Sequence, residues 1–552
     1  MDQDLGASRD LMQRWELTVD RIITHAARWH GGALVVSRSA DGSTARTSYA
    51  DIEQRARRFS AALQAAGIDR GDRVATLAMN SARHVETWFG IMGIGAVCHT
   101  VNPRLFDEQL VYILNHARAR WLIADPPFAP LVARLMPQCP ALERIVYLCD
   151  RDGLPAERGA AVDYEGLIAS VAADCRWGDF DERTAAALCY TSGTTGHPKG
   201  VLYTHRSEVL HMLITSQGGV LGLTAEDAVL MVVPMFHANA WGIPFATAAV
   251  GAKLVLPGAR LDPASLYELL EAERVTYSAA VPTVWQVLLD YLNENRLGLS
   301  TLKRVLIGGS ACPPALIRGF RDGHGVDVVQ GWGMTEMSPI GTVSVPVPAI
   351  AALGAEERLA YAAKQGRVPF GVDMKITDDD GGTLAHDGKR AGHVRVRGPA
   401  VIARYFREPG PDALDPEGYF DTGDIGTIDA HGYLQITDRA KDLIKSGGEW
   451  ISSVEIENIA AGHPKALMAA VIAVPHPKWR ERPLLVVRLK PGACATRDEF
   501  LSFLDGKIAR WWMPDDVVFV DEMPLGATGK LDKKRLRAQF PAGSADCTET
   551  VR

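Results

Sequence analysis

The strongest constraint on the fold is a long alternation of short apolar segments with amphipathic segments of helical length. Across residues 187–332, strand-like runs such as Lys253–Leu256 and Arg304–Ile307 are separated by stretches long enough for helices. A similar rhythm covers residues 33–124, where Val74–Met79 is the clearest strand candidate. Alternation of this kind is typical of βαβ units, which build mostly parallel sheets covered by helices. The sequence therefore predicts an α/β fold with a large N-terminal lobe of parallel βαβ subdomains.

The pattern changes after about Val368. The segments Met374–Ile376, His393–Val396 and Tyr433–Ile436 are short, β-rich and separated by Gly, Asp and Pro, which predicts a small antiparallel or barrel-like subdomain. From Asp438 onward a charged, Gly-rich turn leads into mixed strands and helices, as expected for a small α+β domain.

These changes define the expected domains. The final residues are small and polar, and we expect this tail to be disordered. The predicted units are an N-terminal domain over residues 1–437, a mobile C-terminal domain over 438–540, and the tail over 541–552.

Composition narrows the class of protein. A chain of 552 residues is too long for one ordinary domain, and 47% hydrophobic with 23% charged residues is typical of a globular protein with a sizeable core. The net charge of −7 leaves no global basic field for nucleic acid. No apolar run reaches the roughly 20 residues of a membrane span, the N-terminus lacks a secretory signal, and the eight cysteines form no C-x-x-C pair. We expect a soluble, cytoplasmic protein with reduced thiols.

The most informative motif is Tyr-Thr-Ser-Gly-Thr-Thr-Gly-His-Pro-Lys-Gly at residues 190–200, directly after the apolar run Ala185–Cys189. Its glycines let the backbone turn sharply, and its hydroxyls and lysine are donors suited to phosphate oxygens. It does not match the Walker A pattern. The predicted phosphate-binding residues are Thr191, Ser192, Gly193, Thr194, Thr195, Gly196 and Lys199.

Six further motifs follow in order, and two of them show their chemistry directly. In 234–241 (Pro-Met-Phe-His-Ala-Asn-Ala-Trp), His237 can orient a carboxylate and Trp241 is a large apolar wall. In 330–336 (Gln-Gly-Trp-Gly-Met-Thr-Glu), Trp332 offers a flat face for adenine and Glu336 a hard oxygen ligand for Mg²⁺. The remaining motifs are Gly308–Pro313, Tyr419–Asp424, Asp438–Glu449 and Pro524–Lys530.

This ordered set resembles the adenylate-forming (AMP-binding) superfamily, in particular its medium- and long-chain fatty acyl-CoA synthetases. The resemblance implies a carboxylate activated by ATP as an acyl-adenylate, with pyrophosphate released, followed by transfer to coenzyme A with release of AMP. ATP, Mg²⁺ and coenzyme A are the implied cofactor and co-substrates, and a small carboxylic acid is the implied partner. The oligomeric state stays open, with a homodimer as one alternative.

The resemblance also implies roles for individual residues. Asp438 is the implied hinge of the C-terminal domain, and Thr191 with Glu336 the implied metal site. The implied catalytic residues are Lys530, Glu336, Thr335 and His237. The implied nucleotide-binding residues, besides the loop, are Gly309, Gln330, Gly331, Trp332, Thr335, Asp424, Arg439, Lys441 and Lys445. The implied acyl pocket comprises His237, Ala238, Trp241, Gly309 and Gly333. The implied coenzyme A route comprises Lys445, Ser446, Gly447, Gly448 and Trp450. The last motif departs from the family at Leu525, where a basic residue is common.

The acid itself is less constrained. By resemblance, Gly333 lies where acetate-specific relatives carry a tryptophan, which favours a longer chain, and His237 stands where amino-acid-adenylating domains carry an aspartate. A pocket without that countercharge penalises an amino acid's cation. We therefore predict an acyl-CoA ligase for a medium- or long-chain fatty acid. The alternatives are a ligase for another apolar acid (aryl or methylthio-alkanoate) and a stand-alone module that loads a carrier protein. A degenerate nucleotide-binding scaffold is disfavoured because Lys199, Glu336, Asp424 and Lys530 are all present.

Overall fold

A computed structural model of the chain describes residues 12–156, 159–191, 197–409, 411–439, 442–446, 449–526 and 531–541, without the side chains of residues 449 and 450.

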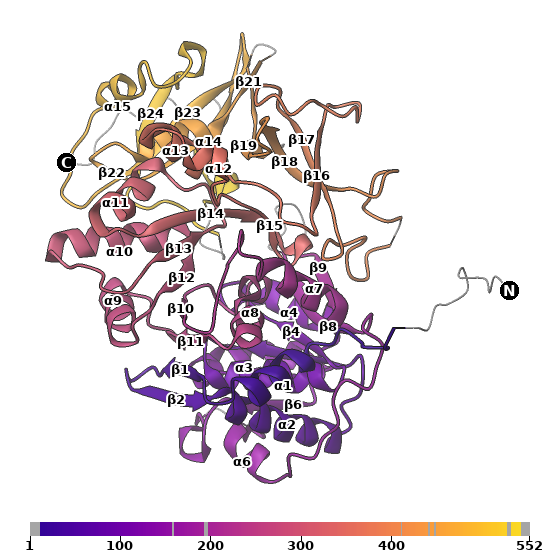
Figure 1. Cartoon of the computed structure of the whole chain (residues 1–552). Coiled ribbons are helices and arrows are strands. Elements are labelled where there is room, and N and C mark those ends of the chain that lie inside the picture. Colours follow the sequence, from indigo (N-terminus) through magenta and orange to yellow (C-terminus); the bar gives the residue numbers. More distant parts are fainter. Residues whose placement is uncertain are drawn as a thin grey trace.

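Two large sheets form the N-terminal lobe (Figure 1). The strands of the first sheet are β1 (Leu34–Arg38), β2 (Thr44–Ser48), β10 (Ala228–Met231), β11 (Lys253–Leu256), β12 (Tyr277–Ala280), β13 (Arg304–Ile307), β14 (Asp327–Gly333) and β15 (Ile340–Val343). The strands of the second sheet are β3 (Arg73–Leu77), β4 (Val97–Thr100), β5 (Trp121–Ala124), β6 (Arg144–Tyr147), β7 (Val162–Asp163), β8 (Ala185–Tyr190) and β9 (Gly200–Thr204). Their orders are β15-β14-β13-β12-β10-β11-β1-β2 and β7-β6-β5-β3-β4-β8-β9. Only the pairs β1–β2, β14–β15 and β8–β9 are antiparallel, so the predicted α/β class is confirmed.

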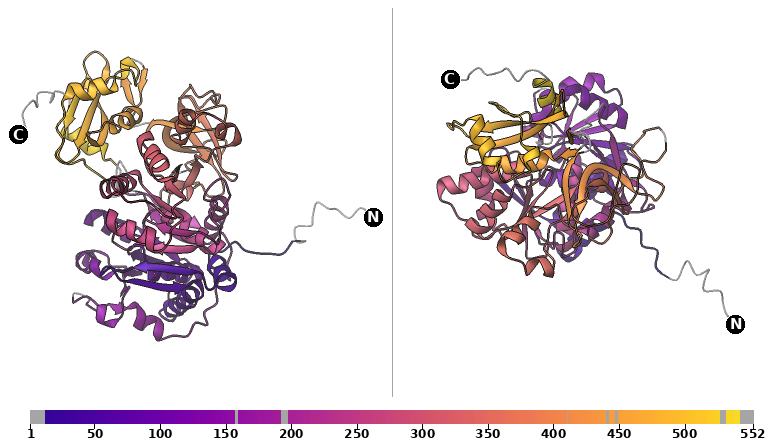
Figure 2. Two further views of the ribbon diagram at one scale, coloured as in Figure 1. Left: turned by 60° about the vertical axis from the view of Figure 1, so that its left-hand side comes forward. Right: turned by 90° about the horizontal axis from the view of Figure 1, so that it is seen from above.

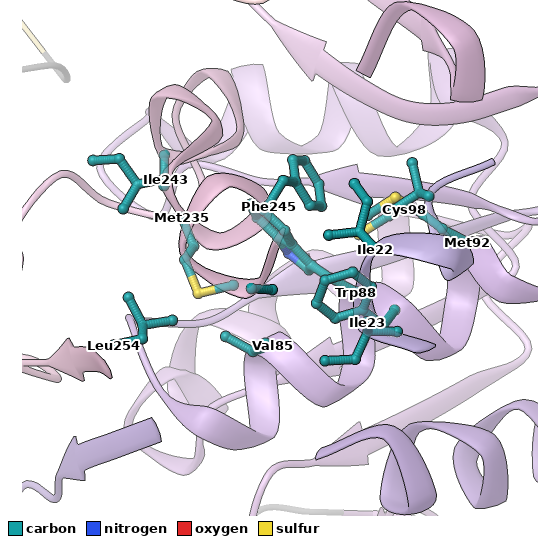
Figure 3. Close-up of a cluster of buried hydrophobic side chains, with 14 of the residues drawn as sticks. Ile22, Ile23, Val85, Trp88, Met92, Cys98, Met235, Ile243, Phe245 and Leu254 are labelled. Atoms are coloured by element: carbon teal, nitrogen blue, oxygen red, sulfur yellow. The ribbon is translucent and has the colours of Figure 1, made fainter. Parts of the chain in front are cut away.

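The layers follow from the period of two along each strand, which sends neighbouring side chains to opposite faces. In β1, Val35 belongs to a core shared by both sheets, whereas Val36 belongs to a core on the outer face of the first sheet. The longer helices that contribute to the shared core are α1 (Asp20–Trp29), α2 (Tyr49–Ala65), α3 (Ala82–Gly93), α7 (His205–Thr215) and α8 (Ile243–Val250). Figure 3 shows Trp88 of α3 and Phe245 of α8 meeting near Ile22 and Ile23 of α1, and their ring centroids lie 6.0 Å apart.

Other helices cover the outer faces. The helices on the first sheet's outer core are α9 (Pro263–Ala272), α10 (Pro282–Asn295), α11 (Pro314–His324) and α13 (Ala355–Ala362). The second sheet's outer core holds α4 (Asp107–Ala117) and α5 (Ala129–Leu135). Two short helices, α6 (Tyr164–Ala169) and α12 (Pro348–Ala351), complete the lobe. Each sheet is thus covered by helices on both sides, as parallel sheets require.

The predicted β-rich subdomain is one antiparallel sheet, drawn in orange in Figure 1. Its strands, in spatial order, are β16 (Asp373–Thr377), β17 (Gly392–Arg397), β18 (Phe420–Ile428) and β19 (Leu434–Arg439). The antiparallel prediction is confirmed, but barrel-like closure is wrong. The outer edge of β19 bonds instead to the segment before β16, through Gln365 N to Leu434 O and Leu434 N to Gly366 O, so β19 is not available to pair with β16.

The C-terminal part forms a separate unit (yellow in Figure 2) around a five-stranded sheet. Its strands are β20 (Ile444–Ser446), β21 (Glu449–Ile451), β22 (Ala466–His476), β23 (Arg480–Leu489) and β24 (Asp516–Phe519). Its helices are α14 (Ser453–Ala461), α15 (Arg497–Leu504) and α16 (Lys533–Gln539). The α+β prediction is confirmed, although the β22–β23 hairpin is much longer than the short strands expected from the sequence.

Two further observations concern membrane spans and cysteines. Among the described helices, none combines the length and apolarity needed to cross a bilayer. The seven described cysteines are all free thiols, and six of them are buried.

Candidate active site

The phosphate-loop motif lies at the carboxyl end of β8. The strands β8 and β9 pair with Tyr190 opposite Gly200, and Thr191 N donates to Lys199 O at 2.9 Å. This hydrogen bond closes the base of the loop. The predicted donors Ser192, Gly193, Thr194, Thr195 and Gly196 lie outside the described residues.

A tyrosine joins the end of this loop to the predicted metal ligand. Lys199 Nζ lies 4.7 Å from the centre of the Tyr405 ring, and the Tyr405 hydroxyl donates to Glu336 Oε1 at 2.9 Å. Burial and the adjacent Glu336 raise the pKa of Tyr405, which therefore stays a neutral donor. Tyr203 of β9 holds the same turn by donating to Thr335 O at 2.6 Å. The structure thus brings together Lys199, Thr335 and Glu336. No pattern in the sequence pointed to the two tyrosines.

A second cluster surrounds Asp424, whose side chain is only 3% exposed. The Trp332 indole Nε1 donates to Asp424 Oδ2 at 2.9 Å, and Arg439 Nε lies 2.6 Å from Asp424 Oδ1. The Arg439 contact follows from sheet register, because Asp424 of β18 pairs directly with Arg439 of β19. Three residues predicted to bind nucleotide from three separate motifs therefore meet at one carboxylate.

Gln330 shapes the neighbouring glycine loop. Its side-chain oxygen accepts from Cys312 N at 3.2 Å, and its own N–H donates to Ser344 Oγ at 2.8 Å. Gly309 has φ 87°, a conformation that favours glycine. Gln330 is 1% exposed, and its side chain holds the Gly308–Cys312 backbone in place through Cys312.

Three of the predicted acyl residues, His237, Ala238 and Trp241, lie at or on a left-handed turn, Ala238–Gly242. The buried Trp241 indole packs against the first glycine of the 308–313 motif: a Cβ on Gly308 would lie 3.0 Å from Trp241 Cη2 and 3.2 Å from Gly331 O. His237 is partly exposed, and its N–H donates to Pro234 O. Trp241 therefore forms a wall directly beside the strand ends that carry the nucleotide residues.

Gly333 has a packing role that the sequence did not reveal. A Cβ at this position would lie 1.8 Å from Pro339 O and 3.0 Å from Gly341 N, which are backbone atoms. The close approach of β14 to the start of β15 requires glycine here. Its presence alone is therefore no indication of a long acyl chain.

Arg104 is a candidate site residue that sequence reasoning missed. It follows the carboxyl end of β4, beside β8 in the second sheet, and its guanidinium lies 5.7 Å from the centre of the Phe236 ring. Within the described part of the chain it forms no ion pair, and its side chain stays exposed although partial desolvation by nearby protein atoms lowers its pKa. The sequence pattern that could have indicated Arg104 is Asn-Pro-Arg directly after an apolar strand. In the structure its guanidinium lies next to the segment that carries His237, where it can bind an anion.

The predicted hinge residue is buried. Asp438 is 1% exposed, and its Oδ2 accepts from Ser453 N at 2.8 Å at the start of α14. Burial raises its pKa, and the Lys533 ammonium opposes this rise. Lys533 Nζ donates to Ser453 Oγ at 2.6 Å and lies 2.8 Å from Glu457 Oε1. Asp438 is thus bound to the C-terminal unit and is not an ordinary surface aspartate.

Two residues predicted for the coenzyme A route, Lys445 and Ser446, lie on β20 of the C-terminal sheet. Lys445 is exposed and its N–H donates to Glu481 Oε2 at 2.8 Å, whereas Ser446 is buried. The predicted Lys441, Gly447, Gly448 and Lys530, and the side chain of Trp450, lie outside the described residues. The helix that follows Lys530 touches the N-terminal lobe, since the Arg535 guanidinium lies 5.9 Å from the centre of the Phe106 ring.

Comparison with known proteins identifies this arrangement. Residues 23–406 match the family described as AMP-binding enzyme, and residues 455–530 match its C-terminal domain. The chain belongs to the AMP-binding enzyme family. It is 50% identical to a 3-methylmercaptopropionyl-CoA ligase of Ruegeria pomeroyi, over 95% of this chain and 97% of the relative. It is 46% identical to a medium-chain-fatty-acid–CoA ligase of Ectopseudomonas oleovorans, over 96% of this chain and 97% of the relative.

A solved structure agrees in fold. The crystal structure of the anthranilate CoA ligase AuaEII in complex with anthranoyl-AMP superposes with a TM-score of 0.85 at 25% identity, covering 96% of this chain and 98% of that one. The predicted enzyme class is therefore confirmed: this AMP-binding enzyme is an AMP-forming acid–thiol ligase that uses ATP and coenzyme A.

Proposed function

We propose that this ligase activates an apolar carboxylic acid, with a medium- or long-chain fatty acid as the first candidate. The observation that carries the proposal is the position of Trp241: its buried indole closes an apolar wall against Gly308, next to the strand that holds Trp332 and Glu336. A pocket lined in this way accepts an uncharged tail and penalises a charged one. The fatty-acid CoA ligase at 46% identity supports this choice.

In the proposed reaction the substrate carboxylate attacks the α-phosphorus of ATP, the bond to the β-phosphate oxygen breaks, and pyrophosphate leaves. The thiol of coenzyme A then attacks the acyl carbonyl, and AMP leaves. Trp332 and Asp424 hold the nucleoside, while Lys199 and the loop donors hold phosphate oxygens. His237 orients the acid, and Lys530 offsets charge that builds on the α-phosphate. Catalysis by such groups is mainly positioning and electrostatic stabilisation.

Magnesium fits the residues present. Mg²⁺ in such enzymes is usually held by one or two carboxylates together with substrate phosphates. Glu336 supplies a carboxylate of fixed orientation, since Tyr405 bonds one of its oxygens, and the Thr191 hydroxyl stands at the base of the phosphate loop. When bound, the ion neutralises phosphate charge.

A short methylthio-alkanoate is the second candidate. The 3-methylmercaptopropionyl-CoA ligase is 50% identical to this chain, and the packing requirement at Gly333 removes one argument for a long acyl chain. Both candidates share an apolar tail and a single carboxylate.

The experiment is a matched panel of acids in a pyrophosphate-release assay, with loss of free thiol as a second readout. The panel runs from acetate through butyrate, octanoate and palmitate, with 3-methylthiopropionate, benzoate and an amino acid. The highest kcat/KM for octanoate or palmitate supports the first candidate, and the highest for 3-methylthiopropionate selects the second. The highest value for benzoate rejects both candidates in favour of an aryl acid, and the highest value for acetate or an amino acid contradicts the proposal.

We also propose that residues 438–540 rotate as a mobile domain about Asp438, so that Lys530 serves adenylation and the turn at Ser446–Gly448 serves thioester formation. The coenzyme A route and the boundary at residue 437 are part of this proposal.

Arg104 is a candidate for binding an anionic group of either ATP or coenzyme A. The reduced thiols support a cytoplasmic location, and a homodimer is a prediction that gel filtration with light scattering tests.

A further inference from the structure

The turn that carries Trp241 has an uncommon backbone. Ala238, Asn239, Ala240 and Trp241 have φ of 43°, 48°, 49° and 58°, and Gly242 continues with φ 75°. Each non-glycine residue in this left-handed region costs about 1–2 kcal/mol. Consecutive residues of this kind persist only where surrounding contacts hold them.

The side chain of Asn239 supplies such contacts. It is 1% exposed, and its Nδ2 donates to Glu208 Oε1 at 2.6 Å. Its Oδ1 accepts from the Cys189 thiol at 3.3 Å, and Thr100 Oγ1 lies 3.2 Å from the same sulfur. Asn239 therefore ties the turn to α7 on one side and to the end of β8 on the other.

Glu208 is an unexpected residue at this place. Its carboxyl group is fully buried on α7, and within the described part of the chain it forms no ion pair. Its second oxygen, Oε2, has no described hydrogen-bond partner. Burial raises the pKa of Glu208 to about 8, so the group is neutral near pH 7. A buried carboxyl group is costly, and the bond to Asn239 is the described hydrogen bond that compensates for it.

A second residue of α7 supports the other end of the turn. His211 Nε2 accepts from Ile340 N at 3.1 Å, and a Cβ on Gly242 would lie 2.9 Å from His211 Nδ1. The helix thus contacts the turn at Asn239 through Glu208 and at Gly242 through His211. Trp241 lies between these two points, against Gly308.

We propose that Glu208 is a positioning residue that fixes the left-handed turn through Asn239 and so sets the length of acid that fits against Trp241. The proposal rests on the proposed function, because it assigns the acyl pocket to this wall. A turn released at Asn239 relaxes toward ordinary backbone geometry, which moves the indole away from Gly308 and lengthens the pocket.

The test compares Glu208→Ala with Glu208→Gln, which keeps the shape and the acceptor oxygen. Leu213→Ala, an exposed position on the same helix, is the matched control. We expect Glu208→Ala to change the ratio of kcat/KM for octanoate over butyrate by about tenfold, the effect of one buried hydrogen bond. Glu208→Gln and Leu213→Ala keep the wild-type ratio, and the KM for ATP stays within about twofold in all three.

A second readout does not depend on activity. Backbone hydrogen exchange of residues 238–242 rises in Glu208→Ala and in Asn239→Ala, and stays at the wild-type rate in Glu208→Gln. Unchanged acid ratios and unchanged exchange in Glu208→Ala, or equal losses for every acid with a raised KM for ATP, overturn the proposal. Should wild-type protein activate none of the acids, the proposed function fails, and the exchange comparison still decides whether Glu208 holds the turn.

Discussion

At the scale of single residues, the site depends on a few buried side chains whose partners fix their charge and direction. Asp424 is held on both oxygens, by Trp332 and Arg439, and Glu336 is held by Tyr405. The sequence predicted these carboxylates from their motifs. It could not predict Tyr405 and Tyr203, because they reach the motifs through pairings set by the fold.

Asp424→Ala is expected to weaken nucleotide binding more than acid binding. Hydrogen bonds to a charged group contribute about 1.5–3 kcal/mol, so the KM for ATP should rise about 10- to 100-fold. Steady-state kinetics with ATP and acid varied in turn measure both effects. An unchanged KM for ATP with a raised KM for the acid would contradict the role of Asp424 in nucleotide binding.

Glu208 gives the protein a specific pH dependence. Its pKa in the folded chain, about 8, lies above its ordinary value of 4.5, so the stability it contributes is present below pH 4.5 and is lost as pH rises through 8. The groups that face it do not titrate in this window: the pKa of Cys189 is raised to about 12, that of Tyr203 is raised well above its ordinary value, and that of His211 is lowered to about 3. We expect Glu208→Gln to gain stability relative to wild type between pH 5 and 8, on the order of a few kcal/mol. Urea unfolding across this range measures the gain, and a constant difference would contradict it.

At the scale of elements, strand positions were predictable where an apolar run stood alone between turn residues. Both β11 and β13 have the predicted bounds, Lys253–Leu256 and Arg304–Ile307. The left-handed turn Ala238–Gly242 was not predictable, since among its residues only Asn239 and Gly242 favour positive φ. The contacts that hold it come from α7 and β8, which are distant in sequence.

Gly333→Ala tests the contact between β14 and β15. The added Cβ would meet the Pro339 carbonyl, so the strand must shift, and Trp332 and Glu336 shift with it. We expect activity with every acid to fall, together with a lower melting temperature. Gly218→Ala is the control, because a Cβ there meets nothing within 4 Å. A variant that merely prefers shorter acids, at full stability, would restore the original pocket interpretation of Gly333.

At the scale of the whole molecule, the two units meet at a buried, charged boundary. Asp438 is the penultimate residue of β19 in the open sheet of the N-terminal part, yet its carboxylate bonds to Ser453 of the C-terminal part. The composition change in the sequence indicated this boundary. The cluster of Asp438, Lys533 and Glu457 could not be predicted, because Lys533 lies 95 positions after Asp438 in the chain.

Replacing Asp438 separates its two contributions, backbone freedom and charge. Asp438→Pro fixes φ near about −65°, whereas Asp438→Ala removes the carboxylate and leaves rotation free. We expect thioester formation in Asp438→Pro to fall on the order of tenfold or more relative to pyrophosphate release, because rotation is needed only for the second half-reaction. Asp438→Ala should keep the ratio of the two rates near that of wild type. If the ratio of thioester formation to pyrophosphate release is the same in both variants, the chain does not pivot at Asp438.

In the proposed reaction, one protein performs two half-reactions through an acyl-adenylate. The direct measurement is a single-turnover experiment with octanoate, or with 3-methylthiopropionate if the panel selects it, and ATP in the absence of coenzyme A. We expect one equivalent of pyrophosphate and an enzyme-bound acyl-adenylate, which added coenzyme A converts into acyl-CoA and AMP in equal amounts. Formation of ADP and phosphate, or release of AMP without loss of thiol after coenzyme A is added, would contradict it.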